Sequence, residues 1–375
     1  MSTPPLPADL LPAGAEGDAV VIKPSSLGDI VHTLPAVAWL RQAWPGLRLH
    51  WVANTEWTPL LQGSPLLESV IAFPRSEFRG LGGLLRARRW FRDYGAAMGA
   101  RNVRLALDFQ GLLRSAWLAR QSAAPVILGL EDAREGSRFF YRAQVPAAGP
   151  RGEVRHAVER YLGLVRALGP GCDEREALAG DWLPAGEPVA GMPDGAFIAL
   201  HPFARGTGKS LGWAAVASLA EAWRGFPVVV VGRTNDAAPP DLPANVIDLV
   251  NATSLRQLIG LLRRARVVVS VDSGPMHLAS ALHRPLLGVH TWSDPRKVGP
   301  YHPGAWVWKG GRILRRTEVD EALAARDEVP DAAALPAIAE FVAAMLREPS
   351  PDSAACARER EDGSRPRGFH QAGQG

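Results

Sequence analysis

Three loops of this 375-residue chain combine charged or polar side chains with small residues, and each loop directly follows a short apolar run. The first loop runs from Lys23 to Asp29 (KPSSLGD) and leads into a helical pattern. Asp29 near the start of that helix is suited to cap it by accepting backbone N–H bonds. A carboxylate at the end of a strand is equally suited to take a proton from a substrate hydroxyl. The residues alone leave both interpretations of Asp29 open.

The second loop, residues 202–210 (PFARGTGKS), imitates a nucleotide-binding P-loop. Phe203 stands where that motif needs a glycine, so the P-loop interpretation fails. A glycine-rich loop that carries Arg205 and Lys209 just before a helix still suits phosphate groups. The alternative is a flexible basic loop on the surface.

The third loop, residues 272–277 (DSGPMH), follows a run of buried type and starts another helix. The free N–H groups around Asp272, Ser273 and Gly274 favour a pyrophosphate, and the helix dipole adds to that attraction. His277 lies on the first helical turn, where it is placed to donate to the same anion. The alternative for His277 is an ordinary helix histidine with satisfied hydrogen bonds.

Short apolar runs alternate with amphipathic stretches in two series, one within residues 19–128 and one within residues 197–290. Such a pattern indicates parallel sheets that are covered on both faces. We therefore expect an α/β fold with two Rossmann-like, doubly wound domains that face each other across a cleft. In such sheets, ligands bind at the carboxyl ends of the strands, where the three loops are expected.

Changes in composition predict the domain boundaries. A break rich in Gly and Pro follows residue 168, and the last residues are charged and poor in large apolar side chains. The expected organisation is a flexible N-terminus (1–17), an N-terminal domain (18–170), a linker (171–195), a C-terminal domain with a final helix at Leu335–Leu346 (196–348) and a disordered tail (349–375).

The composition excludes several functional classes. Lys and Arg number 42 against 38 acidic residues, a net charge of +4 that is too small to indicate nucleic-acid binding. No window holds about 18 uncharged apolar residues, and the N-terminus lacks the features of a signal peptide. Two cysteines, Cys172 and Cys356, indicate neither a disulfide scaffold nor a thiolate metal site. The first loop also lacks the glycine fingerprint of dinucleotide binding, so we expect a cytoplasmic protein without metal or cofactor.

One stretch of the N-terminal half is dense in arginine and apolar residues. Its alternatives are a solvated helix face, or a basic and partly apolar surface for an anionic acceptor and the face of a membrane. The arginines are Arg75, Arg79, Arg86, Arg88, Arg89 and Arg92, and the apolar residues include Phe78, Leu81, Leu84, Leu85, Trp90 and Phe91.

Together these stretches resemble the lipopolysaccharide heptosyltransferases, glycosyltransferase family nine. The matching segments are Ile22–Pro35, Asp108–Ser115, His156–Arg160 and Ser270–Leu278. The resemblance extends from about residue 19 to residue 345, in the same motif order. It is closest to the members that add the first heptose to Kdo of the inner core.

The resemblance implies the GT-B architecture and an inverting, metal-independent transfer from ADP-L-glycero-D-manno-heptose to lipid-linked Kdo, on or near the inner membrane. Asp29 matches the catalytic base, Lys209 a lysine on the donor phosphates, and the loop from Asp272 to His277 the donor-binding loop. Arg205 is a further candidate for the donor phosphates. The candidates on the acceptor side are Lys23, Arg75, Arg79, Arg114 and Arg134.

Several positions depart from the family pattern and concern the donor. Ser273 replaces a common threonine, and residues 290–295 read HTWSDP where the family usually has YGPTDP. The loop after Val231 lacks a glutamate often found there. Transfer of another sugar or to another core position therefore stays open, as does a nucleotide-sugar epimerase of the same architecture. An epimerase would need carboxylates on both sides of the sugar.

Overall fold

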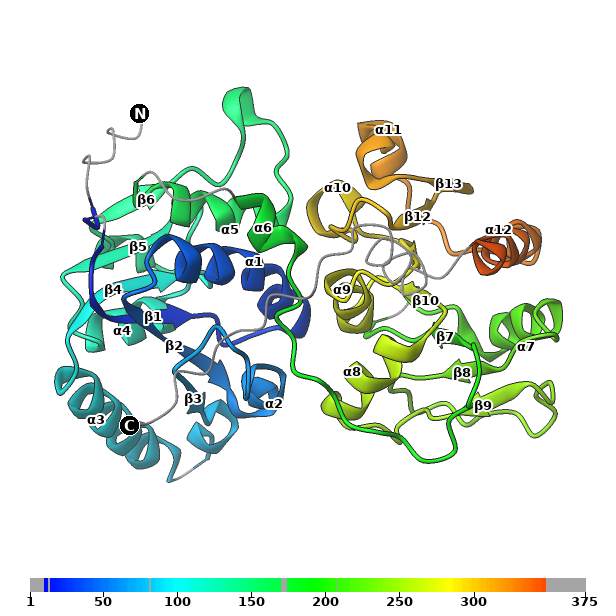
Figure 1. The fold of residues 1–375 in the computed structure, drawn as a ribbon, viewed down its shortest axis with the longest axis horizontal. Helices are drawn as coiled ribbons and strands as arrows, with labels where there is room; N and C mark the ends of the chain where they lie inside the picture. The colour runs from blue at the N-terminus through cyan, green and yellow to red at the C-terminus, as the bar shows by residue number, and fades with distance from the viewer. Residues whose placement is uncertain (1–9, 13, 81, 170–173, 207, 349–375) are drawn as a thin grey trace, which may run out of the picture.

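The computed structural model describes residues 10–12, 14–80, 82–169, 174–206 and 208–348. The predicted tail 349–375, most of the predicted N-terminal segment and both cysteines lie outside these residues. The described chain forms two lobes, each built on one sheet, which lie side by side in Figure 1. No helix among the described residues is both long and apolar enough to cross a membrane.

The first sheet has six strands in the order β3-β2-β1-β4-β5-β6, and all of its pairs are parallel. Helices on both faces cover it, as the apolar character of β1 and β4 predicts. The strands are β1 (Gly17–Ile22), β2 (Leu47–Asn54), β3 (Ser69–Phe73), β4 (Val103–Asp108), β5 (Val126–Leu130) and β6 (Ala143–Val145). The helices are α1 (Leu27–Ala43), α2 (Thr58–Leu61), α3 (Gly83–Gly99), α4 (Leu113–Gln121), α5 (Ala157–Arg166) and α6 (Glu174–Ala179).

The second sheet has seven strands in the order β13-β12-β11-β10-β7-β8-β9, and only the β12–β13 pair is antiparallel. Its strands are β7 (Ile198–His201), β8 (Val228–Val230), β9 (Val246–Asp248), β10 (Val267–Val271), β11 (Leu286–Val289), β12 (Trp306–Lys309) and β13 (Arg312–Leu314). Its helices are α7 (Gly212–Ala222), α8 (Leu255–Arg264), α9 (Gly274–Ala281), α10 (Pro295–Val298), α11 (Glu321–Ala324) and α12 (Leu335–Arg347).

Each sheet reverses its winding direction once. In the first sheet the chain runs from β1 to β2 on one side and to β4 on the other; in the second, β7 lies between β8 and β10. Ligands of doubly wound sheets bind at these switch points, outside the carboxyl ends of the strands. The loops after β1, β4, β7 and β10 are therefore the expected binding loops. They contain Lys23, Asp29, Arg114, Arg205, Lys209 and the residues 272–277, whereas Arg75 and Arg79 follow β3 and Arg134 follows β5.

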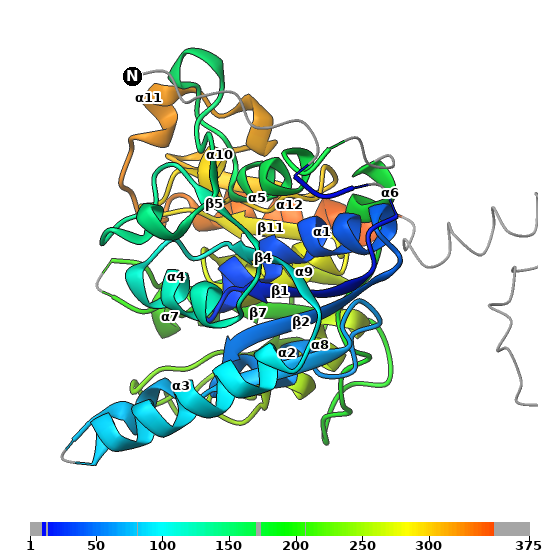
Figure 2. The same ribbon diagram turned by 90° about the vertical axis from the view of Figure 1, so that its left-hand side faces the viewer.

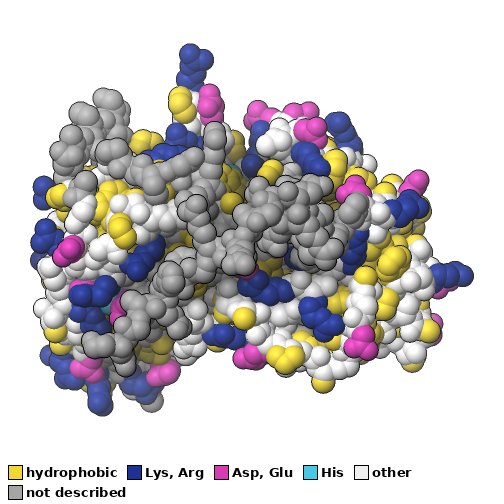
Figure 3. Space-filling model, in the orientation of Figure 1, with side chains coloured by type: hydrophobic (Ala, Val, Ile, Leu, Met, Phe, Trp, Pro, Cys, Tyr) yellow, Lys and Arg dark blue, Asp and Glu magenta, His cyan; other side chains and the backbone are white. Residues whose placement is uncertain are grey.

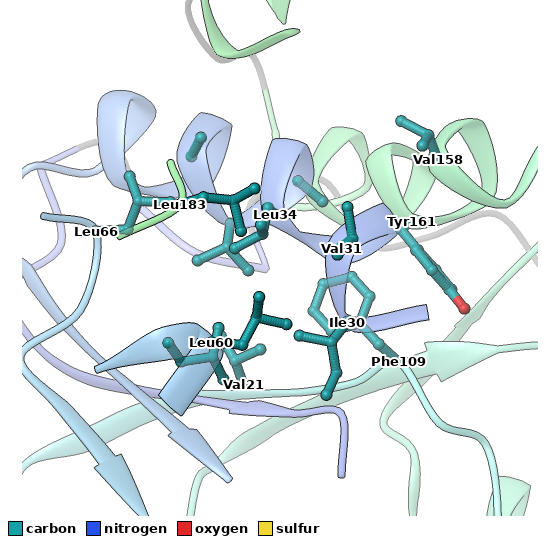
Figure 4. Close-up of a cluster of buried hydrophobic side chains, with 14 of the residues drawn as sticks. Val21, Ile30, Val31, Leu34, Leu60, Leu66, Phe109, Val158, Tyr161 and Leu183 are labelled. Atoms are coloured by element: carbon teal, nitrogen blue, oxygen red, sulfur yellow. The ribbon is translucent and has the colours of Figure 1, made fainter. Parts of the chain in front are cut away.

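Helix α1 covers one face of the first sheet, and it contacts helix α9 of the second lobe (Figure 1). Its side chains Ile30, Val31 and Leu34 are buried, as is Val21 of the strand below. Helix α1 carries apolar residues on nearly all sides, because it packs against α5, α6 and α9 and shares a core with residues of the first sheet (Figure 4). This burial fixes the position of the first turn of α1, which carries Asp29.

Described residues of the predicted N-terminal segment and of the predicted linker are packed against the rest of the protein. Leu10 and Leu11 are buried, and the indole of Trp44 donates to the carbonyl of Pro12 at 3.0 Å. Within the N-terminal segment predicted to be flexible (1–17), Leu10 and Leu11 are therefore held by apolar contacts. The predicted linker 171–195 contains helix α6, and its Leu183 belongs to the same core as α1 (Figure 4).

Candidate active site

Asp29 lies at the third position of helix α1 and caps the start of that helix. Its Oδ2 accepts hydrogen bonds from the backbone N–H of Ser26 at 3.1 Å and from the Ser26 hydroxyl at 2.9 Å. The side chain nevertheless remains 42% exposed. Asp29 is therefore not the N-cap itself but the third-position partner of the N-cap residue Ser26, and its other carboxylate oxygen remains available to a ligand.

Lys23, at the end of β1, lies beneath this carboxylate. Its ammonium donates to the carbonyl of Phe109 at 3.0 Å and lies 4.0 Å from Oδ1 of Asp29. Burial favours the neutral amine, but the side chains of Tyr161 and Asp29 more than offset it, and the pKa of Lys23 is raised. Lys23 is only 3% exposed, so it holds a positive charge under Asp29 instead of presenting it at the surface.

The start of α9 contacts the start of α1 directly. A Cβ atom at Gly28 would lie 2.4 Å from Cδ2 of His277, and one at Gly274 would lie 2.2 Å from Cδ2 of Leu27. Such distances are far below ordinary contact, so only glycine fits at either position without a shift of its neighbour. The first turns of the two helices therefore meet, one from each lobe.

His277 lies in this contact as a buried, neutral imidazole. Burial lowers its pKa, although Asp272 and Asp29 both act to raise it. Its Nε2 is 3.6 Å from Oδ1 of Asp272, while its buried Nδ1 has no hydrogen-bond partner among the described residues. A neutral His277 can donate one hydrogen bond to an anion but supplies no full positive charge.

The donor loops predicted from the sequence follow three neighbouring strands, β7, β10 and β11. Ser273 is the N-cap residue of α9, but its side chain does not cap the helix; its Oγ lies 3.0 Å from Nδ1 of the buried His201. In the loop after β7, the Lys209 ammonium lies 3.6 Å from the ring centre of Trp292, in the loop after β11. Arg205 is exposed at the tip of its loop. The structure thus gathers Lys209, Ser273 and the α9 start at one edge of the second sheet.

Comparison with known proteins identifies the family. Residues 92–312 match the model described as glycosyltransferase family 9 (heptosyltransferase). The chain belongs to glycosyltransferase family 9. This family 9 enzyme is 31% identical over 308 residues to lipopolysaccharide heptosyltransferase 1 of Pseudomonas aeruginosa, covering 75% of this chain and 81% of the relative. It is 28% identical over 319 residues to the protein of the same name from Escherichia coli K12, covering 78% and 93%.

Solved structures share the fold of this glycosyltransferase. The E. coli heptosyltransferase WaaC with ADP superimposes with a TM-score of 0.66 at 24% identity, covering 88% of this chain and 99% of that one. The E. coli ADP-heptose lps heptosyltransferase II gives a TM-score of 0.64 at 20% identity, covering 88% and 98%. The predicted GT-B architecture of two facing Rossmann-like domains is therefore confirmed.

Three of the four arginine candidates on the acceptor side of the glycosyltransferase lie in loops at the carboxyl edge of its first sheet. Arg75 follows β3, and Arg114 lies at the start of α4, after β4. The pKa of Arg114 is lowered, first by partial burial and then by the positive charge of Arg75. The backbone N–H of Arg134 donates to Gly111 at 2.8 Å, which joins the loops after β5 and β4. Arg79 lies apart, exposed between β3 and α3. The structure therefore brings Arg75 close to Arg114 and positions Arg134 on an adjoining loop.

Two histidines that the sequence did not single out connect the lobes of the glycosyltransferase. The His32 ring lies edge-on to those of His277 (4.3 Å) and His156 (5.1 Å). His156 Nδ1 accepts from Val158, so Nε2 carries the proton and donates to the carbonyl of Gly299 at 2.9 Å. Burial lowers the pKa of His156 to about 3. Both lie in segments that match the family, Ile22–Pro35 for His32 and His156–Arg160 for His156, but neither histidine was proposed as a site residue.

A buried carboxylate organises the loop after β4. Asp108 accepts from the N–H groups of Gln110 and Gly111 at 2.9 and 3.0 Å, and from the hydroxyls of Ser115 and Tyr141 at 2.9 and 2.7 Å. These four bonds fix the turn that carries Arg114 at the start of α4. The sequence motif included Asp108 without indicating this supporting role.

A cavity of about 410 Å³ lies between the lobes, beside the contact of α1 with α9. Its walls come from both lobes, including His32 of α1, Trp182 of the connecting segment and His277 of α9. Among the described residues, no group of three or more His, Cys, Asp or Glu side chains is placed to hold a metal ion.

Proposed function

We propose that this glycosyltransferase transfers a heptose from ADP-L-glycero-D-manno-heptose to Kdo of the lipopolysaccharide inner core. Support for these substrates comes from the relatives: lipopolysaccharide heptosyltransferase 1 of P. aeruginosa is similar over 81% of its length. The observation that carries the chemistry is the partly exposed Asp29 carboxylate beside the first turn of α9.

The proposed reaction is a single displacement with inversion. Asp29 accepts the proton of an acceptor hydroxyl while its oxygen attacks the anomeric carbon, and the bond from that carbon to the ADP oxygen breaks. No second carboxylate serves as a nucleophile in this proposal, so the configuration inverts once. Lys23 supports the arrangement by holding its charge 4.0 Å from the Asp29 carboxylate.

Negative charge grows on the leaving diphosphate during this step. We assign its stabilisation to the Lys209 ammonium, to the free N–H groups at Ser273 and Gly274, and to the neutral His277 as a hydrogen-bond donor. The exposed Arg205 is a further cation of the same loop. With these groups in place, the proposed transfer proceeds without a divalent metal.

On the acceptor side, Arg75, Arg114 and Arg134 are proposed to bind the carboxylates of Kdo, since guanidinium groups suit planar carboxylates. Helix α3 is proposed to rest on the anionic face of the inner membrane. It projects from the first lobe (Figure 2), and Lys and Arg side chains gather where it lies (Figure 3). Its Leu84 and Leu85 are 80% and 72% exposed, and they share a groove with Arg88 and Arg92.

The proposed function is tested by incubating the purified protein with ADP-heptose and Kdo-lipid A, with and without EDTA, and weighing the lipid by mass spectrometry. We expect a product heavier by one heptose in both samples, with an inverted anomeric linkage by NMR. If a panel of nucleotide sugars shows transfer only from another donor, the substrate assignment is wrong. If EDTA abolishes transfer, the metal-independent mechanism is wrong.

A further inference from the structure

The loop after β11 holds one large aromatic side chain outward from a firmly anchored backbone. His290 Nδ1 lies 2.8 Å from the Ser293 hydroxyl, and the carbonyl of Thr291 accepts bonds from the buried Lys309 ammonium and the backbone N–H of Glu328. Trp292, between these anchors, is 48% exposed. The family pattern has no aromatic residue at this position, so Trp292 is a feature of this chain.

The exposed indole of Trp292 contacts a charged group: the Lys209 ammonium lies over its ring. The distance from Nζ to the ring centre is 3.6 Å, well inside the range of cation–π attraction. The alkyl part of Lys209 passes Gly206, where a Cβ atom would lie 3.4 Å from its Cδ and Cε. Gly206 has a φ of +101°, which favours glycine at this point of the loop.

The base of the Lys209 loop is also closed. The Ser210 hydroxyl bridges the N–H and carbonyl of Ala204 at 2.9 and 3.2 Å, and the Leu211 N–H donates to Pro202 at 2.9 Å. The backbone of Lys209 is thus held by hydrogen bonds within its loop, and its ammonium by an indole from another loop. Lys209 makes no ion pair with a carboxylate of the described residues within 4.0 Å, so its charge is not neutralised by the protein there.

An aromatic face attracts an ammonium without consuming its hydrogen-bond donors. The N–H groups of the lysine that point away from the ring can still reach phosphate oxygens. An aromatic support therefore keeps the cation in place and leaves it available to an anion, which a carboxylate partner would not do.

We propose that Trp292 is a positioning residue for donor binding: it holds the Lys209 ammonium at the place where the diphosphate of the nucleotide sugar arrives. This inference rests on the proposed role of Lys209 at the donor phosphates. It predicts that Trp292 matters for ligands with phosphates and not for the nucleoside alone.

The test is calorimetric titration of ADP and of adenosine into the wild type, Trp292→Leu, Trp292→Phe, Lys209→Ala and the Lys209→Ala/Trp292→Leu double variant. Loss of the cation–π contact should weaken ADP binding about two- to fivefold in Trp292→Leu. Trp292→Phe keeps an aromatic face and should retain most of the affinity. Adenosine binding should not change, and Trp292→Leu should have no further effect once Lys209 is alanine. Thermal melting confirms that each variant is folded.

Three results separate the possible failures. If Lys209→Ala binds ADP like the wild type, the proposed donor role of Lys209 is wrong. If Lys209→Ala weakens ADP binding but folded Trp292→Leu does not, only the inference about Trp292 is overturned. The inference is also overturned if Trp292→Leu weakens adenosine binding as much as ADP binding, since the indole would then act on the nucleoside. It is equally overturned if Trp292→Leu weakens ADP binding as much in the Lys209→Ala background as in the wild type, since the indole would then act on the loop itself.

Discussion

Gly28 of the first lobe lies directly against His277 of the second, so closely that a Cβ atom at Gly28 would be 2.4 Å from Cδ2 of the imidazole. The contact joins the helix that carries Asp29 to the helix whose first turn is proposed to bind the donor diphosphate. The spacing of base and donor therefore depends on two residues without side-chain bulk, Gly28 and Gly274.

Gly28→Ala should separate these two helices. Overpacking of a well-fitted contact costs about 1–3 kcal/mol, so we expect kcat/KM to fall about tenfold while each lobe remains folded. Gly99→Ala is the matched control, because a Cβ atom there meets nothing within 4 Å. Gly274→Ala should behave like Gly28→Ala and recover when Leu27→Ala makes room. Unchanged activity in Gly28→Ala would show that this contact does not set the geometry of the site.

Asp108 should be a major source of stability in the first lobe. Asp108→Ala removes the acceptor of two N–H groups and two hydroxyls in a buried loop, at a cost of about 2–4 kcal/mol in the free energy of unfolding. Asp108→Asn keeps a carbonyl oxygen for the N–H groups and should cost clearly less. Urea titrations of both variants measure the difference. Equal stability of Asp108→Ala and the wild type would mean that the four bonds do not support the loop.

Acid should destabilise this protein through its buried histidines. Burial lowers the pKa of His156 to about 3, and of His201 and His290 to about 4, against an ordinary value near 6.5. Between pH 6.5 and 4 the unfolded chain therefore binds more protons than the folded one. Above pH 6.5 these histidines are neutral in both states and cost no stability. Below pH 6.5 the free energy of unfolding falls by about 1.4 kcal/mol per histidine for each pH unit.

Denaturation at pH 7.5 and at pH 5.5 tests this prediction. The pKa of Asp18 is lowered to about 2, first by its hydrogen bond with Arg48. Asp18 therefore loses its contribution to the free energy of unfolding only below about pH 4, outside the range compared. His201→Phe should reduce the pH dependence relative to the wild type. Equal unfolding free energies at the two pH values would contradict the assignment of neutral, buried histidines.

Helix α3 should bind anionic membranes. Replacing Leu84 and Leu85 by serine, or Arg88 and Arg92 by glutamate, should weaken binding to phosphatidylglycerol vesicles at least about tenfold, because each basic residue near the surface contributes about 1 kcal/mol. Arg312→Glu, at an exposed position of the second lobe, is the control for a charge reversal away from α3. Flotation assays measure the binding. Equal binding by all variants would mean that α3 is only a solvated helix.

The sheets were largely predictable because buried parallel strands are short, nearly continuous apolar runs. Ten strands lie where such runs were identified, including β1 and β10. The short β6 and the β12–β13 pair were not predicted, since three or four residues that include Gln, Lys or Arg carry no clear period. The packed Leu10 and Leu11 were missed for a similar reason: two apolar residues among prolines do not reveal a contact with a distant helix.

The site was predictable only one loop at a time. The sequence places Asp29, Lys209 and Asp272 at the carboxyl ends of strands, which follows from parallel topology. Contacts between segments far apart in the chain were not predictable, such as Lys209 with Trp292 or His156 with Gly299. The His156–Gly299 pair depends on how the two lobes meet, and the Lys209–Trp292 pair depends on the directions of side chains from two loops of one sheet. No local pattern encodes either.

The most direct test of the account is the activity of Asp29→Asn with the proposed donor and acceptor. The amide oxygen can still accept the hydrogen bonds of Ser26, so the cap of α1 and the affinity for ADP should persist. Loss of the general base should lower kcat about 10²- to 10⁴-fold. A folded Asp29→Asn enzyme that binds ADP normally and turns over within about tenfold of the wild type would contradict the assignment of Asp29 as the base.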